Sequence, residues 1–309
     1  MRSRRISEYH PFTAYFEQLP EWDGTDRVSA LARRVSDDPV WVNGFHRWML
    51  GVSAQWMQLN PDNNRANSVA PLLVSSRQGL GKSTFCRLLM PDRLKSYYTE
   101  SYDLSSPASA EAKLAAYGLI NLDEFDKLGA SKMPLLKNLM QMSDLNIRKA
   151  YQQSFRQLPR VASFIGTSNR FDLLTDPTGS RRFLCVEVER VIDCTHIEHD
   201  QIYAQLKAEL LAGRRDWFTK EEEQVLQVQN AAFYRVYPAE DVFHSYFRVA
   251  NSGEKCIGLT AAQIFRELQQ KNSAAMRSVN PMRFGQVLLK AGVVRRHTEY
   301  GNVYQVVRR

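Results

Sequence analysis

The chain has 309 residues, of which 44% are hydrophobic, and it carries 41 Lys/Arg against 33 Asp/Glu. This length allows one large domain or two to three smaller ones, and no apolar run approaches the ~20 residues that a membrane helix requires. The four cysteines are scattered without a C-x-x-C pair, and the N-terminus has no signal-peptide pattern, which predicts free thiols in a cytoplasmic setting without a membrane.

The net charge of +8 is unevenly distributed. Residues 253–309 hold ten Lys/Arg and three Asp/Glu, a net charge of +7, so the rest of the chain is nearly neutral. A basic module on a neutral body favours a polyanionic partner, nucleic acid first, over a surface that is merely soluble and basic.

In chain order, the first 66 residues are predicted to be helical. We expect helices over residues 11–19, from a cap at Asp26 to about residue 35, and over residues 39–59. In the last of these, apolar residues recur at helical spacing on one face, which is typical of a buried core: Trp41, Phe45, Trp48, Met49, Val52 and Trp56.

From residue 68 to about residue 190, short apolar segments alternate with helical stretches. The apolar segments show no polar/apolar alternation, so we expect strands that are buried on both faces, as in a parallel sheet flanked by helices. These strands are predicted at 69–75, 117–122, 160–166 and 183–188, and helices after Gly81, near 108–116 and near 132–142.

The remainder is predicted to be helical up to about residue 252. After that residue the pattern of predicted elements changes. Thr219 and Glu222 form a capping box that opens a helix from 220 to about 235. Further helices are predicted from the Thr260 cap to about 270 and from 281 to 291. A hairpin of 293–299 and 303–307 follows, and two helices before a hairpin is the order of a winged helix-turn-helix.

These segments predict an α/β fold in three parts. An N-terminal helical region covers residues 1–66, and an ATPase core with a parallel sheet covers residues 67–215. A helical, winged-helix-like basic module covers residues 216–309.

The strongest motif is the glycine-rich loop Ser76-Arg77-Gln78-Gly79-Leu80-Gly81-Lys82-Ser83. It nearly matches the P-loop pattern G-x-x-x-x-G-K-[ST] and lies between a predicted strand and a predicted helix. Glycines let backbone N–H groups surround phosphate oxygens. We expect Lys82 to reach the β- and γ-phosphates and Ser83 to bind Mg²⁺. The nucleotide-binding residues are predicted to be Gln78, Gly79, Leu80, Gly81, Lys82, Ser83 and Thr84.

A second motif ends the predicted strand 117–122 with Asp123-Glu124. An apolar strand followed by two carboxylates is the Walker B arrangement. Asp123 is expected to hold Mg²⁺, and Glu124 to orient or deprotonate the attacking water, which favours ATP hydrolysis over ATP binding alone.

Two further motifs complete the predicted catalytic set. Asn169 follows the strand 160–166, where its side chain can hydrogen-bond the γ-phosphate or the lytic water; Thr167 and Ser168 are weaker candidates. Arg181 and Arg182 precede the last strand, and either can supply an arginine finger to the ATP of a neighbouring subunit. The alternative for this pair is a surface salt bridge.

Two basic regions are candidates for DNA contact. Residues 148–156 (RKAYQQSFR) suggest a hairpin that carries Arg148, Lys149, Tyr151 and Arg156, a combination suited to phosphate contact and base stacking along a single strand. A solvated loop is an equal alternative. In the C-terminal module, the candidates for contact with duplex DNA are Arg283, Lys290, Arg295, Arg296 and Arg308.

Taken together, these motifs resemble the virulence-associated protein E family of phage and mobile-element ATPases, which is similar to superfamily 3 helicases and to the helicase half of viral primase–helicases. The resemblance covers residues 11–190 approximately and rests on Trp22-Asp23-Gly24 with Arg27, Gln78-Gly79-x-Gly81-Lys82-Ser83-Thr84, Leu122-Asp123-Glu124, Ser143-x4-Arg148-x2-Tyr151, Gly166-Thr167-Ser168-Asn169 and Asp176-x2-Gly179-x-Arg181-Arg182-Phe183. It implies an AAA+-like core, a hexameric homo-oligomeric ring and a hairpin that grips DNA in the pore. The sequence departs from the family pattern at Ser76, Ala150 and Ser180.

The sequence therefore predicts an ATP- and Mg²⁺-dependent DNA translocase or helicase in the replication of a mobile element. Because no primase-type metal site is visible, any primase is expected to be another chain or a missing segment. The alternative is an ATP-switched initiator or loader that binds DNA without unwinding it. A ring ATPase that senses phage DNA in regulation or defence is a more distant third.

Overall fold

The computed structural model describes eight stretches of the chain: residues 10–59, 65–148, 155–174, 180–234, 238–251, 253–276, 279–299 and 301–309. The chain folds into two units, Met1–Tyr234 and Arg235–Arg309. Within the described stretches, no helix combines the length and the apolar character that a bilayer crossing requires.

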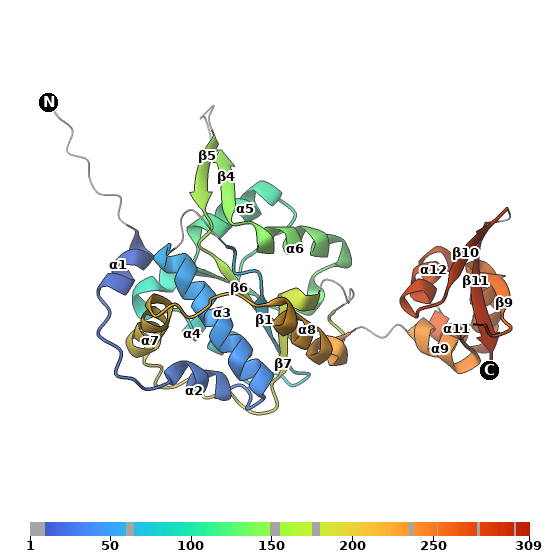
Figure 1. The fold of residues 1–309 in the computed structure, drawn as a ribbon, viewed down its shortest axis with the longest axis horizontal. Coiled ribbons are helices and arrows are strands. Elements are labelled where there is room, and N and C mark those ends of the chain that lie inside the picture. Colours follow the sequence, from blue (N-terminus) through green and yellow to red (C-terminus); the bar gives the residue numbers. More distant parts are fainter. Residues whose placement is uncertain are drawn as a thin grey trace. The chain divides into compact units, whose positions relative to one another are not determined.

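A five-stranded parallel sheet forms the centre of the first unit (Figure 1). The strands lie in the order β2-β3-β6-β1-β7. Strand β2 (Tyr98–Thr99) is not predicted by the sequence, because two residues carry no periodicity. The other four confirm the predicted strands: β1 (Ala70–Val74), β3 (Leu119–Leu122), β6 (Ser163–Ser168) and β7 (Phe183–Glu187).

Helices cover both faces of this sheet, which explains why successive residues of β1, β3, β6 and β7 are buried. Alternate strand residues point to opposite faces; Ile165 and Leu184 enter one core, whereas Phe164 and Cys185 enter the other. The first core also receives α1 (Pro11–Glu17), α2 (Arg27–Arg33), α3 (Pro39–Met57), α4 (Lys82–Leu88) and α7 (His199–Leu211). The second receives α5 (Pro107–Ala116) and α6 (Met133–Gln141).

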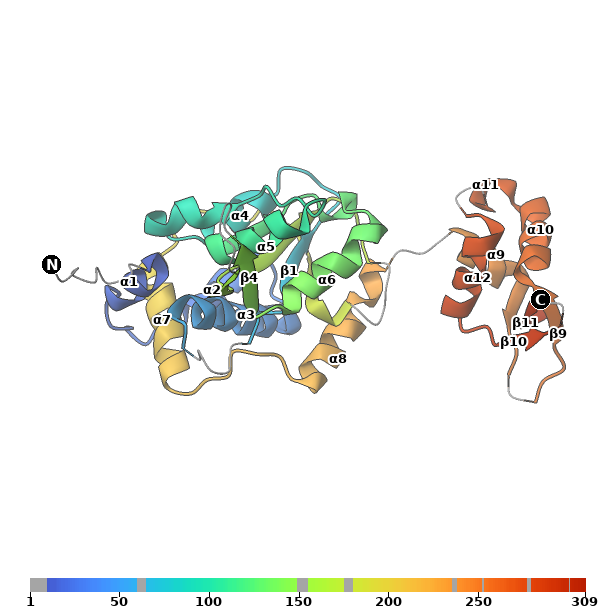
Figure 2. The same ribbon diagram turned by 90° about the horizontal axis from the view of Figure 1, so that it is seen from above.

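The N-terminal helices share their core with the sheet and do not form a separate one. The aromatic stripe of α3 is buried as predicted, with Trp41, Trp48 and Trp56 at most 1% exposed. Helix α7 lies beside α3 (Figure 2). The boundary predicted at residue 66 thus has no counterpart in the division of the chain, which falls after Tyr234.

Helix α8 (Lys220–Gln229) also packs on the first unit, since its Leu226 is buried in the first core. The boundary predicted at residue 215 groups α8 with the C-terminal residues. The structure instead places α8 in the first unit. The capping box of Thr219 and Glu222 is confirmed. The helix ends at Gln229 and not near residue 235, because the chain continues as a 3-10 turn, η6 (Asn230–Phe233).

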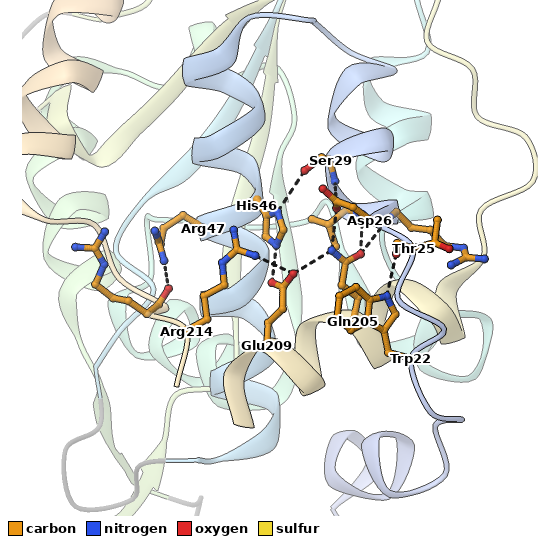
Figure 3. A network of polar contacts seen from close by, with 12 residues as sticks. Trp22, Thr25, Asp26, Ser29, His46, Arg47, Gln205, Glu209 and Arg214 are labelled. Carbon is orange, nitrogen blue, oxygen red and sulfur yellow. Dashed lines mark hydrogen bonds and ion pairs between the residues drawn. The ribbon is translucent and has the colours of Figure 1, made fainter. Parts of the chain in front are cut away.

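A network of polar contacts fixes α2 and α3 against α7 (Figure 3). Gln205 of α7 accepts from the Arg27 backbone N–H at 2.9 Å and donates to Asp26, which caps α2, at 2.8 Å. Glu209 is hydrogen-bonded to the buried His46 of α3 at 2.6 Å. Trp22 of the Trp-Asp-Gly motif lies beside this network and donates from its indole N–H to the Thr25 carbonyl at 2.8 Å.

The second unit combines helices with an antiparallel sheet around its own core. The helices predicted from Thr260 and Pro281 are confirmed, as is the final hairpin of β10 (Arg295–Thr298) and β11 (Gly301–Arg308). Strand β11 also pairs with β8 (Phe247–Val249) and β9 (Ile257–Thr260). The helices are α9 (Pro238–Tyr246), α10 (Ala261–Lys271), α11 (Ser273–Met276) and α12 (Pro281–Lys290).

Candidate active site

The predicted catalytic residues of the strand ends meet at one edge of the parallel sheet. Strands β1, β6 and β3 are neighbours and parallel, so their carboxyl ends lie side by side, where ligands bind in open α/β sheets. A pocket of about 400 Å³ opens there. It is lined by Gln78, Gly79, Leu80, Gly81, Lys82, Ser83, Thr84, Asp123, Glu124, Thr167 and Asn169.

The backbone of the glycine-rich loop explains which of its residues must be glycine. Gly79 and Gly81 have φ values of 77° and 84°, in the left-handed region that strains other residues. Ser76 has no such conformation; among the described residues, the non-glycine positions with positive φ are Gln58, Glu124 and His196. Serine therefore fits without backbone strain where the pattern has its first glycine.

Lys82 is held inside the pocket and is only 7% exposed. Its Nζ donates to Asn169 Oδ1 and to the carbonyl of Arg77, both at 3.1 Å. Burial lowers the pKa of Lys82, and the nearby carboxylates of Asp123 and Asp126 oppose that shift. The structure thus brings together two predicted residues that lie 87 positions apart, with the ammonium group held by acceptors at the pocket wall.

Ser83, Asp123 and Thr167 form a cluster of oxygen atoms in the same pocket. Asp123 Oδ1 accepts from Ser83 Oγ at 2.8 Å and from Thr167 Oγ1 at 2.6 Å. Such oxygens suit a hard cation such as Mg²⁺, which usually takes one or two protein ligands and completes its shell with water and phosphate oxygens. In the part of the chain that the structure describes, no group of three or more His, Cys, Asp or Glu could hold a metal ion.

Glu124 lies at the rim of the pocket on a turn that requires an unusual backbone. Its φ of 51° is left-handed, which is uncommon for a residue with a side chain. Its carboxylate forms an ion pair with Lys127 at 2.6 Å. That hydrogen bond raises the pKa of Lys127. Sequence reasoning misses Lys127, because only the turn after Glu124 brings the two side chains together.

Asp126 is a second residue that sequence reasoning misses. Its Oδ1 accepts from Ser168 Oγ at 3.0 Å and from the Asn169 backbone N–H at 3.2 Å. It therefore ties the end of β6 to the turn after β3 and fixes the backbone from which Asn169 reaches Lys82. The only sequence signal is an acidic residue two positions after Glu124.

Arg181 and Arg182 are not among the residues that line the pocket. They lie on a 3-10 turn, η5 (Ser180–Arg182), directly before β7. Arg181 forms an ion pair with Glu223 of α8 at 3.3 Å. The salt bridge that is the alternative interpretation is thus present for Arg181, and neither arginine lines the pocket.

The predicted hairpin exists as β4 (Asp144–Arg148) and β5 (Phe155–Pro159), which pair antiparallel with Arg148 opposite Phe155. Arg148 and Arg156 lie on these strands, whereas Lys149 and Tyr151 lie outside the described residues. Arg160 anchors the base of the hairpin. Its buried guanidinium donates to the carbonyls of Met140 at 2.6 Å and Leu139 at 3.1 Å, and burial lowers its pKa to about 10.

The predicted DNA-binding residues of the second unit lie at its surface. Arg283 in α12 and the β10 residues Arg295 and Arg296 are exposed, and Lys290 is half-buried. Arg308 is ion-paired with Glu267 at 2.9 Å. The unit thus presents positive side chains to solvent.

Two family models match different parts of the chain. The model of the virulence-associated protein E-like domain matches residues 16–235. A model described as a domain of unknown function from B. Theta matches residues 237–306. No curated protein matches the chain.

Among solved structures, the apo structure of the C-terminal region of NrS-1 is 14% identical with a TM-score of 0.46; the match covers 96% of this chain and 78% of that one. Its A form apo structure is 16% identical with a TM-score of 0.44, and the match covers 91% and 65% of the two chains.

Proposed function

Because the chain belongs to the virulence-associated protein E-like family, we propose that it is a replication ATPase that moves along or unwinds DNA. One observation carries the proposal: Lys82, Asn169, Ser83, Asp123 and Glu124 line one pocket at the carboxyl ends of three neighbouring parallel strands. This is the set that phosphoryl transfer from ATP to water needs, with a cation for the phosphates, oxygen ligands for a metal ion and a carboxylate for the water.

The proposal gives each of these residues a role. Backbone N–H groups of the loop 78–83 and the Lys82 ammonium would bind the β- and γ-phosphates. Ser83 and Asp123 would hold Mg²⁺, which neutralises charge on the phosphate oxygens. Glu124 would orient the attacking water and accept its proton, and Asn169 would hold that water or the γ-phosphate.

The remaining candidates fit a homo-oligomeric ring with an AAA+-like core. The pocket contains no guanidinium of its own among its described lining residues. Arg181 and Arg182 would therefore serve the ATP of the next subunit, in a ring that we propose to be hexameric. The β4–β5 hairpin would contact single-stranded DNA in the pore, and the winged-helix-like second unit would bind duplex DNA or a replication partner such as a primase.

Strand displacement tests this proposal directly. The full chain, ATP and a forked DNA substrate are mixed, and displaced strand and released phosphate are measured together. We expect both to rise with ATP. The Glu124→Gln variant should still bind ATP but lose both signals, whereas Glu187→Gln, which alters a strand-end carboxylate outside the pocket, should keep them.

Hydrolysis without displacement, under conditions in which a ring assembles, would contradict the helicase proposal and favour an ATP-switched initiator or loader. Unchanged turnover in Glu124→Gln would remove that residue from catalysis.

A further inference from the structure

Asn230 is a buried polar residue outside the pocket that the proposed chemistry does not use. It follows α8, is 1% exposed, and both ends of its amide are hydrogen-bonded. Its Nδ2 donates to the carbonyls of Ser180 at 2.9 Å and Phe183 at 2.8 Å. Its Oδ1 accepts from the Cys185 backbone N–H at 3.3 Å. These three backbone groups flank the turn that carries Arg181 and Arg182.

The residues after Asn230 make further hydrogen bonds close to the arginine turn. The Phe233 carbonyl accepts from the backbone N–H groups of Leu173 at 3.2 Å and Leu174 at 3.0 Å. A hydrogen bond also joins Tyr234 OH and Ser180 Oγ. Residues 230–234 thus form hydrogen bonds to two segments of the chain, Leu173–Leu174 and Ser180.

The orientation of the Asn230 amide makes this contact specific. Two donors face two carbonyl oxygens and one acceptor faces an N–H, so every polar atom has a complementary partner. An aspartate has the same shape, but its second oxygen would face the carbonyls of Ser180 and Phe183. Such a change should move the arginine turn and leave the apolar packing around it in place.

We propose that Asn230 is a positioning residue for Arg181 and Arg182, fixing the arginine turn in the orientation that a neighbouring subunit's ATP requires. The inference rests on the proposed function, because it assumes that these arginines act in trans. Displacing a catalytic group by about 1 Å can cost on the order of 100-fold in rate. Asn230 sets the backbone on both sides of two adjacent arginines. It is therefore a determinant of turnover, although it contacts neither ATP nor water.

Three variants of the full chain test the proposal: Asn230→Asp, Asn230→Ser, which keeps one donor, and Gln229→Ala as the matched control. Gln229 donates to Asp38 at 2.6 Å and makes no hydrogen bond to the arginine turn among the described contacts. We expect kcat for ATP hydrolysis to fall about 10- to 100-fold in Asn230→Asp and less in Asn230→Ser. Binding of a fluorescent ATP analogue should change less than about two-fold, because the pocket is intact. Gln229→Ala should retain its turnover.

Mixed assemblies separate positioning from mere folding. Asn230→Asp subunits have an intact pocket, and Glu124→Gln subunits have an intact arginine turn. Mixing the two should restore part of the turnover that each lacks alone, as should mixing Glu124→Gln with Arg181→Ala/Arg182→Ala subunits. Wild-type kcat in both Asn230 variants, or loss of turnover that Glu124→Gln subunits do not rescue, would overturn the proposal. Absence of ATP hydrolysis in the unmodified protein would refute the proposed function itself.

Discussion

The candidate active site and the basic second unit present their functional residues in opposite ways. In the first unit, Lys82 is 7% exposed and bound to Asn169, and Asp123 accepts hydrogen bonds from two hydroxyl groups. In the second unit, Arg283, Arg295 and Arg296 are exposed at the surface.

This difference separates two physical strategies. A pre-organised pocket acts through the position of individual atoms, so removing one group should cost most of the activity. An exposed basic surface acts through the sum of its charges, and salt screens each of them. Substitutions should therefore have large, discrete effects in the pocket and small, additive effects in the second unit.

The largest effect is expected at Lys82. Lys82→Ala removes the buried ammonium and leaves Asn169 Oδ1 without that donor, so we expect kcat/KM for ATP to fall by at least about 100-fold. Lys95→Ala, which removes a surface lysine paired with Asp92, is the control and should be unchanged. Steady-state phosphate release measures both. A loss below ten-fold would mean that the pocket does not act as a unit.

A smaller loss is expected at Asp126, which touches the backbone of Asn169 but does not line the pocket. Asp126→Ala should lower kcat about ten-fold and change KM less, because Asn169 loses its support while the phosphate loop remains. Asp172→Ala, which alters a half-buried carboxylate that follows the same strand and pairs with Arg170, is the control. Equal losses in the two variants would show that general destabilisation is responsible.

Sequence patterns identify the residues of this pocket because each pattern is local. Lys82 follows two glycines, and Asp123 and Asn169 each follow an apolar strand. Parallel pairing then brings strand ends together regardless of their separation in the chain. In the structure, β6 lies between β1 and β3, which brings Asn169 close to Lys82.

The supporting residues are not predictable in this way. Lys127 meets Glu124 only because the chain turns directly after β3, and Asn230 reaches the arginine turn across 50 positions of sequence. Neither contact has a periodicity or a motif. The division after Tyr234 is missed for a related reason, because α8 has no sequence feature that shows which core receives Leu226.

A third prediction concerns the loss of stability of the first unit at acidic pH. Burial raises the pKa of Asp26, but hydrogen bonds from Gln205 and Ser29 outweigh this and bring it from 3.8 to about 2. The pKa of Glu209 is also lowered, since hydrogen bonds from His46 and Gln205 outweigh its burial. A carboxylate whose pKa is lower in the folded state stabilises the fold above its unfolded pKa and loses that contribution as the pH falls.

All five tryptophans, Trp22, Trp41, Trp48, Trp56 and Trp217, lie in the first unit, so tryptophan fluorescence reports on that unit alone. We expect its thermal midpoint to be constant near neutral pH and to fall by roughly 5 °C as the pH is lowered from about 5 towards 2. Glu209→Gln should lower the midpoint at pH 7 and flatten this acid dependence. A Glu209→Gln profile parallel to that of the unmodified protein would exclude Glu209 as a source of the effect.

The smallest effect is expected in the second unit. Arg295→Ala and Arg296→Ala should each weaken duplex DNA binding only about two- to three-fold, and each should reduce the slope of log affinity against log salt by about one. Arg248→Ala is the control for the loss of one positive charge, because Arg248 is already paired with Glu254. If either single variant instead loses more than about 100-fold, the arginine reads a base edge with defined geometry, and the second unit resembles the pocket after all. If DNA affinity is unchanged and insensitive to salt, the basic surface binds a protein partner, and its charge serves a different interaction from the one proposed.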